Sequence, residues 1–114
     1  MATYTDGTPE LTDEQRAAAL AKAARARHDR AELLRKVKAG EVRPEDVLMR
    51  RDDLVKKTRV LRFIKAWPGY GDAKARKLMA RLGIAEGRRL GGLGSRQRQG
   101  LLDAIAAAKE KADE

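Results

Sequence analysis

The hydrophobic positions along this chain recur at the spacing of α-helices, and no stretch shows the alternation typical of a β-strand. The pattern is clearest over residues 72–82, where one face is apolar and another is basic. We therefore predict a helix there that packs on one side and exposes positive charge on the other. Gly83 is its C-terminal stop. The apolar positions are Ala75, Leu78, Met79 and Leu82, and the basic ones are Lys74, Lys77 and Arg81.

A long basic helix is predicted over residues 11–39. Thr12 can cap its N-terminus, Gln15 can complete a capping box, and Gly40 ends it. Its first half is rich in alanine with basic residues on all sides, and an apolar stripe thickens only towards the end. We expect the second half to dock and the first half to project into solvent. Residues 1–10 are expected to be disordered.

Shorter helices are predicted in the middle of the chain. Pro44 fits the first position of a second helix. Residues 50–57 form a charged connector, after which Thr58 is expected to cap a third helix. Pro68 ends that helix, because the residue before a proline is pushed out of the α conformation.

The glycine-rich segment 84–95 cannot be one regular helix and predicts one helical turn followed by a tight turn. Ser95 is then expected to cap a last helix. The fold class is therefore all-α, with a long N-terminal helix followed by a small helical domain. The expected parts are a disordered N-terminus (1–10), the long helix (11–39), the helical domain (41–105) and an acidic C-terminal tail (106–114).

The net charge of the chain and its distribution indicate which chemical class of partner the protein binds. The 114 residues carry a formal net charge of +9. Residues 68–100 hold eight Lys/Arg against two Asp/Glu, so most of the excess lies in under a third of the chain. Such a basic block favours a polyanion as partner. The chain lacks cysteine and any apolar run of membrane-spanning length, so we expect a cytoplasmic protein with no disulfide, thiolate metal site, cofactor or membrane contact.

The turn Pro68-Gly69-Tyr70-Gly71 stands directly before the basic helix. Glycine has no Cβ to shield neighbouring N–H groups, and the N-terminus of a helix attracts anions. Lys74 adds a charge beside the turn. We predict that this turn holds a phosphate by its backbone, which gives binding without reading bases.

The order helix, Pro-Gly-x-Gly turn, helix, Arg-Arg-Leu-x-Gly-Leu-Gly turn, helix over residues 67–102 resembles the helix–two-turns–helix domain of the actinobacterial, or mycobacterial-type, integration host factors. The stretch from Leu11 to Leu20 is similar to the long first helix of that family. The resemblance implies a monomeric, non-enzymatic nucleoid protein that binds double-stranded DNA with little sequence preference. It also implies bending or compaction of DNA and assistance to a phage integrase in site-specific recombination.

The DNA contacts that the resemblance implies fall into two groups. The first group is the Pro-Gly-x-Gly turn with the lysine after it, and the second is the Arg-Arg pair with the glycine-rich turn that follows. No catalytic or metal-binding residue is implied. The positions are Pro68, Gly69, Tyr70, Gly71 and Lys74, then Arg88, Arg89, Gly92, Leu93 and Gly94. We add Arg96 as a DNA contact of this chain's own, for the reason given next.

Two positions depart from the family pattern. Gly91 stands where a third arginine is usual, so one contact is missing that Arg96 or Arg98 would have to replace. Trp67 replaces a usual aliphatic residue, and we expect it in the core.

Three other functions compete with this interpretation. Ribosomal protein S13 shares the turn, which makes an RNA- or ribosome-binding protein the main alternative, yet S13 proteins add a very basic C-terminal tail and residues 101–114 here are net negative. A glycosylase fragment is disfavoured because residue 2 is alanine and not the catalytic proline. A coiled-coil adaptor is disfavoured because the heptad positions of the first helix are mostly alanine, with Arg27 among them.

Overall fold

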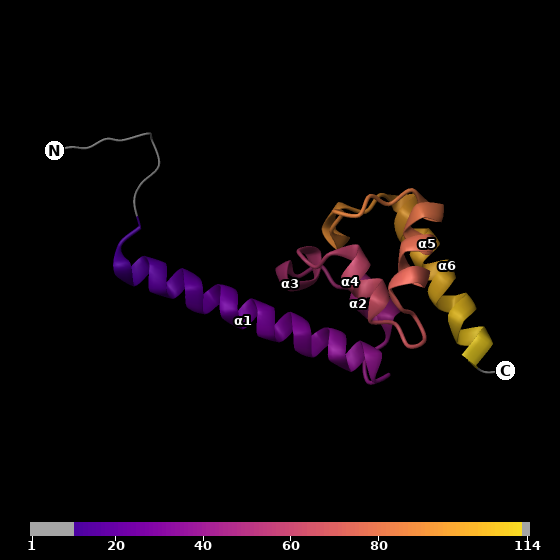
Figure 1. The fold of residues 1–114 in the computed structure, drawn as a ribbon, viewed down its shortest axis with the longest axis horizontal. Helices are drawn as coiled ribbons and strands as arrows, with labels where there is room; N and C mark the ends of the chain where they lie inside the picture. Colours follow the sequence, from indigo (N-terminus) through magenta and orange to yellow (C-terminus); the bar gives the residue numbers. More distant parts are fainter. Residues whose placement is uncertain (1–10, 113–114) are drawn as a thin grey trace.

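The computed structural model describes residues 11–112 and shows an all-α protein, as predicted (Figure 1). Within that range there is no strand, and one isolated antiparallel bridge joins Arg59 to Arg89. The predicted disorder of residues 1–10 concerns residues outside the described range. The elements are α1 (Asp13–Lys38), α2 (Pro44–Met49), α3 (Asp53–Lys56), α4 (Val60–Lys65), α5 (Asp72–Leu82), the 3-10 turn η1 (Leu90–Gly92) and α6 (Ser95–Ala112).

Helix α1 begins with the predicted capping box. The Gln15 N–H donates to Thr12 Oγ1 at 3.0 Å, and the Thr12 N–H donates to Gln15 Oε1 at 2.9 Å. The first half of α1 is exposed and extends away from the other helices (Figure 1). Only its last turns pack on them, through Leu33, Leu34 and Val37.

Helix α4 lies at the centre of the core and packs against α5. Phe63 and Ile64 are fully buried on it, and Trp67 follows just after its end with 2% of its surface exposed, as expected for a core residue. Helix α5 has the predicted bounds, and Gly83 ends it in the left-handed conformation with φ of 70°. The side chains of this core are mostly aliphatic, and α6 closes it with Leu101, Ala104 and Ile105.

The segment between α2 and α4 differs from the prediction. The charged connector contains the short helix α3, and Arg59, not Thr58, is the N-cap of α4. Thr58 is 2% exposed and turns inward, where its hydroxyl donates to the Leu54 carbonyl at 2.8 Å and accepts from Arg30 Nε at 2.9 Å. Thr58 therefore connects α1 to α3 instead of capping a helix.

Helix α6 starts differently. Ser95 is already helical, because the Arg98 N–H donates to the Gly94 carbonyl at 2.9 Å, which makes Gly94 the N-cap. The described part of the acidic tail extends the helix to Ala112. Lys109 on this extension pairs with Glu45 on α2. None of the described helices is long and apolar enough to cross a membrane.

Candidate nucleic-acid interface

The first predicted turn is a tight β-turn at the end of α4. The Tyr70 N–H donates to the Trp67 carbonyl at 3.0 Å. Pro68 and Gly69 occupy its two central positions, and Gly69 has φ of +81°. Proline followed by a glycine with positive φ is the signature of a type II turn. Glycine is required at position 69, because other L-residues are strained at that φ.

The start of α5 next to this turn is open to an anion. Gly71 is the N-cap and has an extended backbone, and no side chain caps the helix. Nothing lies within 4 Å of the position that a Cβ would take at Gly69 or at Gly71. The first N–H groups of a helix have no partner inside it and carry the positive end of the dipole. A phosphate oxygen can therefore reach them without displacing protein atoms.

Aromatic stacking fixes the turn to the core. The Trp67 ring meets Phe63 edge-on at 5.6 Å between centroids and meets Tyr70 at 5.0 Å. Lys74 Nζ lies 4.9 Å from the centroid of the Tyr70 ring, so a cation–π contact holds the ammonium group beside the turn. The side chain of Tyr70 is half-buried against Trp67, and its ring places the ammonium group of Lys74, a residue of the first turn of α5, beside the Pro68–Gly71 turn.

One carboxylate stands at this helix start, and basic side chains neutralise it. Asp72 accepts a hydrogen bond from Arg76 Nε at 2.8 Å and lies 3.6 Å from Lys65 Nζ. The hydrogen bond from Arg76, with a smaller effect of Lys65, lowers the pKa of Asp72. Asp72 therefore leaves little unpaired negative charge to repel an anion.

The second predicted turn lies at the other end of α4. The Val60 N–H donates to the Arg88 carbonyl at 3.0 Å, and the Leu90 N–H donates to the Thr58 carbonyl at 2.9 Å. These bonds attach the segment before η1 to the N-terminus of α4, where buried Leu90 anchors it in the core. The six-residue helix α4 thus separates the two turns by about 9 Å of helix length.

Arg59 is a candidate that sequence reasoning missed. The two bonds above flank the Arg59–Arg89 bridge, which makes it a non-hydrogen-bonded antiparallel pair. Directly opposed side chains in such a pair lie on the same face. Both arginines are exposed, and neither has an ion-pair partner among residues 11–112. Only pairing across the fold reveals this double positive charge, so no local sequence signal could have found it.

The other predicted residues of the second turn have varied surroundings. Arg88 donates from its guanidinium to the Gly92 carbonyl at 2.6 Å and so closes the turn on itself. The N–H groups of the glycine-rich turn are already hydrogen-bonded within the protein. Gly92 donates to the Arg89 carbonyl and Leu93 donates to the Leu90 carbonyl. Gly94 donates to the side-chain oxygen of Gln97.

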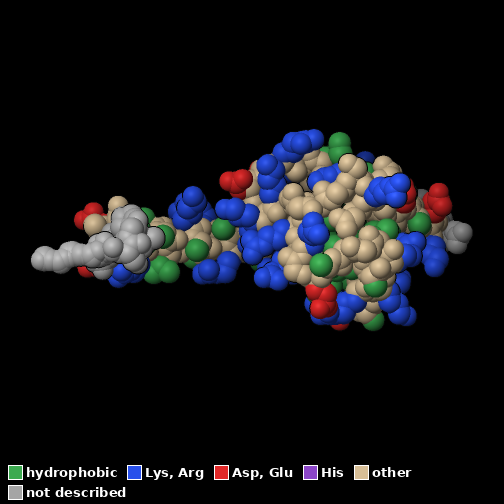
Figure 2. Space-filling model, turned by 90° about the horizontal axis from the view of Figure 1, so that it is seen from above, with side chains coloured by type: hydrophobic (Ala, Val, Ile, Leu, Met, Phe, Trp, Pro, Cys, Tyr) green, Lys and Arg blue, Asp and Glu red, His purple; other side chains and the backbone are tan. Residues whose placement is uncertain are grey.

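Two arginines of α6 take different positions. Arg96 is exposed in the first turn of the helix. Arg98 instead donates to the Leu48 carbonyl at 2.6 Å, so it joins α6 to the end of α2. Figure 2 shows Lys and Arg side chains far more abundant than Asp and Glu over the visible face of the protein, including α1.

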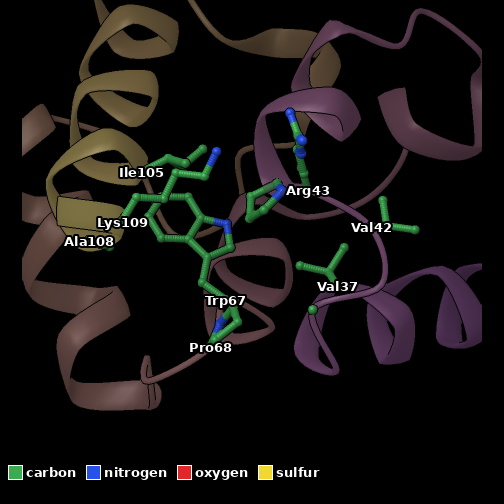
Figure 3. Close-up of a pocket in the computed structure, with 10 residues that line it drawn as sticks. Val37, Val42, Arg43, Trp67, Pro68, Ile105, Ala108 and Lys109 are labelled. Atoms are coloured by element: carbon green, nitrogen blue, oxygen red, sulfur yellow. The ribbon is translucent and has the colours of Figure 1, made fainter. Parts of the chain in front are cut away.

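An apolar pocket of about 210 Å³ lies behind the first turn (Figure 3). The Trp67 ring forms one wall, with Ile105 of α6 on one side of it and Val37 of α1 on the other. Of the residues predicted to contact DNA, only Pro68 lines this pocket. The pocket therefore adjoins the first turn through Pro68 and has no residue in common with the second turn. Within the described residues, no cluster of three His, Asp or Glu side chains could hold a metal ion.

Comparison with known proteins adds a family to this geometry. The model of the S13-like H2TH domain matches residues 36–105. The chain is 47% identical over 102 residues to "Integration host factor" of Mycobacterium tuberculosis strain H37Rv, and the matched residues cover 88% of this chain and 97% of that protein. It is 44% identical over 91 residues to "Integration host factor" of Streptomyces coelicolor, covering 78% and 85%. The solved structure of sIHF bound to an 8-base-pair palindromic DNA is similar with a TM-score of 0.71 and 36% identity, covering 74% of this chain and 97% of that one.

Proposed function

The chain belongs to the integration host factor family with an S13-like H2TH domain, and on that premise we propose that it is a non-enzymatic, nucleoid-associated protein that binds double-stranded DNA. The similar structure of sIHF holds a DNA duplex, and this supports duplex DNA as the ligand here. The RNA-binding alternative is not favoured by these relatives.

The observation that carries the proposal is the placement of an uncapped helix N-terminus and an exposed arginine pair at opposite ends of α4. The first offers the uncapped N-terminus of α5. The second offers the opposed pair Arg59 and Arg89, which lacks a carboxylate partner in the described part of the chain. Two such sites on one rigid helix suit phosphates on two backbone stretches of a duplex.

Each predicted residue has a distinct part in this mechanism. Backbone N–H groups from Gly71 onward receive a phosphate, and Lys74 adds a point charge beside it. Arg59, Arg89 and Arg96 give charge-assisted hydrogen bonds to phosphate oxygens at the second turn. Pro68, Gly69 and Tyr70 shape the first turn. Arg88 and the three turn residues Gly92, Leu93 and Gly94 shape the second, because their polar groups are largely satisfied within it.

Backbone contacts of this kind give affinity without base readout. The described helices present no row of Asn, Gln or Arg at the spacing needed to read the major groove, so we propose binding with little sequence preference. DNA bending or compaction, a monomeric state, action in the cytoplasmic nucleoid and support of a phage integrase in recombination belong to the same proposal. The exposed basic half of α1 is available to a further backbone stretch, and this would favour a bend.

Competition binding tests the proposal. A labelled DNA duplex is bound at moderate salt and challenged with an unrelated DNA duplex, a duplex RNA of equal length, and heparin as a non-specific polyanion. We expect the unrelated DNA to compete as well as the labelled sequence and the RNA to compete less well. Equal competition by DNA and RNA duplexes would overturn the assignment to DNA.

A further inference from the structure

Gly91 in η1 is pressed against Lys56 in α3. A Cβ added to Gly91 would lie 3.0 Å from the Lys56 Cβ and 3.2 Å from the Lys56 carbonyl oxygen. Among residues 11–112 the glycines with positive φ are Gly40, Gly69 and Gly83, so backbone conformation does not require a glycine at position 91. The requirement is space, because η1 packs directly on α3.

This contact bears on the missing third arginine. Position 91 is where the resembling family carries that arginine, and here the Cβ of such a residue would press on the backbone and stem of Lys56. A side chain at position 91 would therefore require Lys56 to shift by a few tenths of an ångström. Lys56 on α3 places a cation next to this position.

A basic pocket surrounds the contact. It has a volume of about 370 Å³ and lies between the α2–α3 connection and η1. Four cations line it, of which Arg50 is bound to Asp52 at 2.8 Å and Arg98 is bound to the Leu48 carbonyl. The other two, Arg51 and Lys56, are exposed and have no ion-pair partner among residues 11–112.

We propose that this pocket binds a backbone phosphate of the DNA duplex, with Lys56 and Arg51 as its cations and Lys56 in place of the third arginine. The inference rests on the proposed DNA-binding function and extends it to a site outside the two turns. Lys56 stands three residues before Arg59, so the pocket continues the positive surface of the Arg59–Arg89 pair. Phosphates in succession along one strand could thus follow the pair and the pocket.

The test measures duplex affinity against salt for Lys56→Gln, which keeps the stem and removes the charge. Lys57→Gln is the matched control, since Lys57 is the adjacent exposed lysine and does not line the pocket. We expect Lys56→Gln to weaken binding several-fold and to make the slope of log K against log salt shallower by about 0.9, the loss of one phosphate contact. Lys57→Gln should change the slope by less than half of that. Equal effects of the two substitutions would overturn the pocket and leave only general charge.

Moving the positive charge from position 56 to position 91 provides a second test. Gly91→Arg alone should lower the melting temperature, because its side chain meets Lys56. The double variant Lys56→Gly/Gly91→Arg removes the contact with the Lys56 side chain but keeps the contact with the carbonyl oxygen of residue 56, so it should recover the wild-type salt slope and only part of the melting temperature. A double variant that folds, as judged by circular dichroism, and still binds like Lys56→Gln would contradict the inference. Absence of duplex binding by the wild type would overturn the proposed function itself, whereas wild-type binding with an unaffected Lys56→Gln overturns the pocket alone.

Discussion

Arg59 and Arg89 face each other across an antiparallel bridge, on a surface where neither meets a carboxylate of the described residues. Like charges placed directly opposite destabilise a strand pair. The two arginines should therefore repel each other where the segment before α4 pairs with the segment before η1. An anion bound between the two guanidinium groups would relieve that repulsion, which would link the local cost to the proposed function.

This relationship predicts opposite effects on stability and binding. Arg59→Ala should raise the free energy of unfolding by about 0.5 kcal/mol at low salt, because it removes the repulsion, and should weaken duplex binding. Urea unfolding and fluorescence anisotropy measure the two effects. Arg62→Ala, in the helix α4 that Arg59 precedes, is the control, since Arg62 lies outside the bridge. A loss of stability in Arg59→Ala would show that the pair is not repulsive.

The two glycines of the first turn should respond differently to alanine. Gly69→Ala forces a Cβ into a residue with φ of +81° and should cost about 1–2 kcal/mol of unfolding free energy. Gly71→Ala meets open space at a φ of −108° and should change stability by less than 0.5 kcal/mol, a typical limit for surface changes. Equal destabilisation in chemical denaturation would contradict the turn geometry described above.

Trp67 should matter for its ring and not for its N–H. Its Nε1 is buried without a hydrogen-bond partner, and its ring joins Phe63 to Tyr70. Trp67→Ala should cost about 3–5 kcal/mol, enough to unfold a marginal domain, whereas Trp67→Phe keeps an aromatic ring and should cost much less. Thermal unfolding followed by circular dichroism compares them. Similar losses in both variants would mean that the aromatic contacts do not hold the turn.

Acid should destabilise the protein through carboxylates whose pKa values are lowered. Hydrogen bonds from Lys109 to Glu45, from Arg50 to Asp52 and from Arg76 to Asp72 lower the pKa of each carboxyl. A lowered pKa contributes stability that is complete above the unfolded-state pKa, about 4 for these groups, and is lost as pH falls through the folded-state value. These groups should therefore leave the urea midpoint nearly constant between pH 7 and about pH 5.5. At pH values under about 4 they should lower the midpoint. Asp72→Asn should reduce the fall, and a loss already complete at pH 6 would refute this origin.

Local chemistry made part of this protein predictable. The capping box at Thr12 and the bounds of α5 up to Gly83 depend on residues close in sequence, and the apolar face of α5 repeats with helical period. The inward turn of Thr58 could not be predicted, because its partner Arg30 is 28 positions away in the sequence. The same limit applies to the candidate interface. Glycine and arginine motifs indicated both turns, but Arg59 and Lys56 enter only through packing against Arg89 and Gly91.

The most direct test of the account is the salt dependence of duplex affinity, measured on two unrelated DNA sequences for the wild type and for Arg59→Ala/Arg89→Ala. If about five to seven phosphates are neutralised, log K should fall with a slope of about −4.5 to −6 against log salt for both sequences. The double variant should bind more weakly and with a shallower slope. A strong preference for one sequence, or a double variant with unchanged affinity and slope, would contradict the claim that this protein holds DNA by its backbone at the two ends of α4.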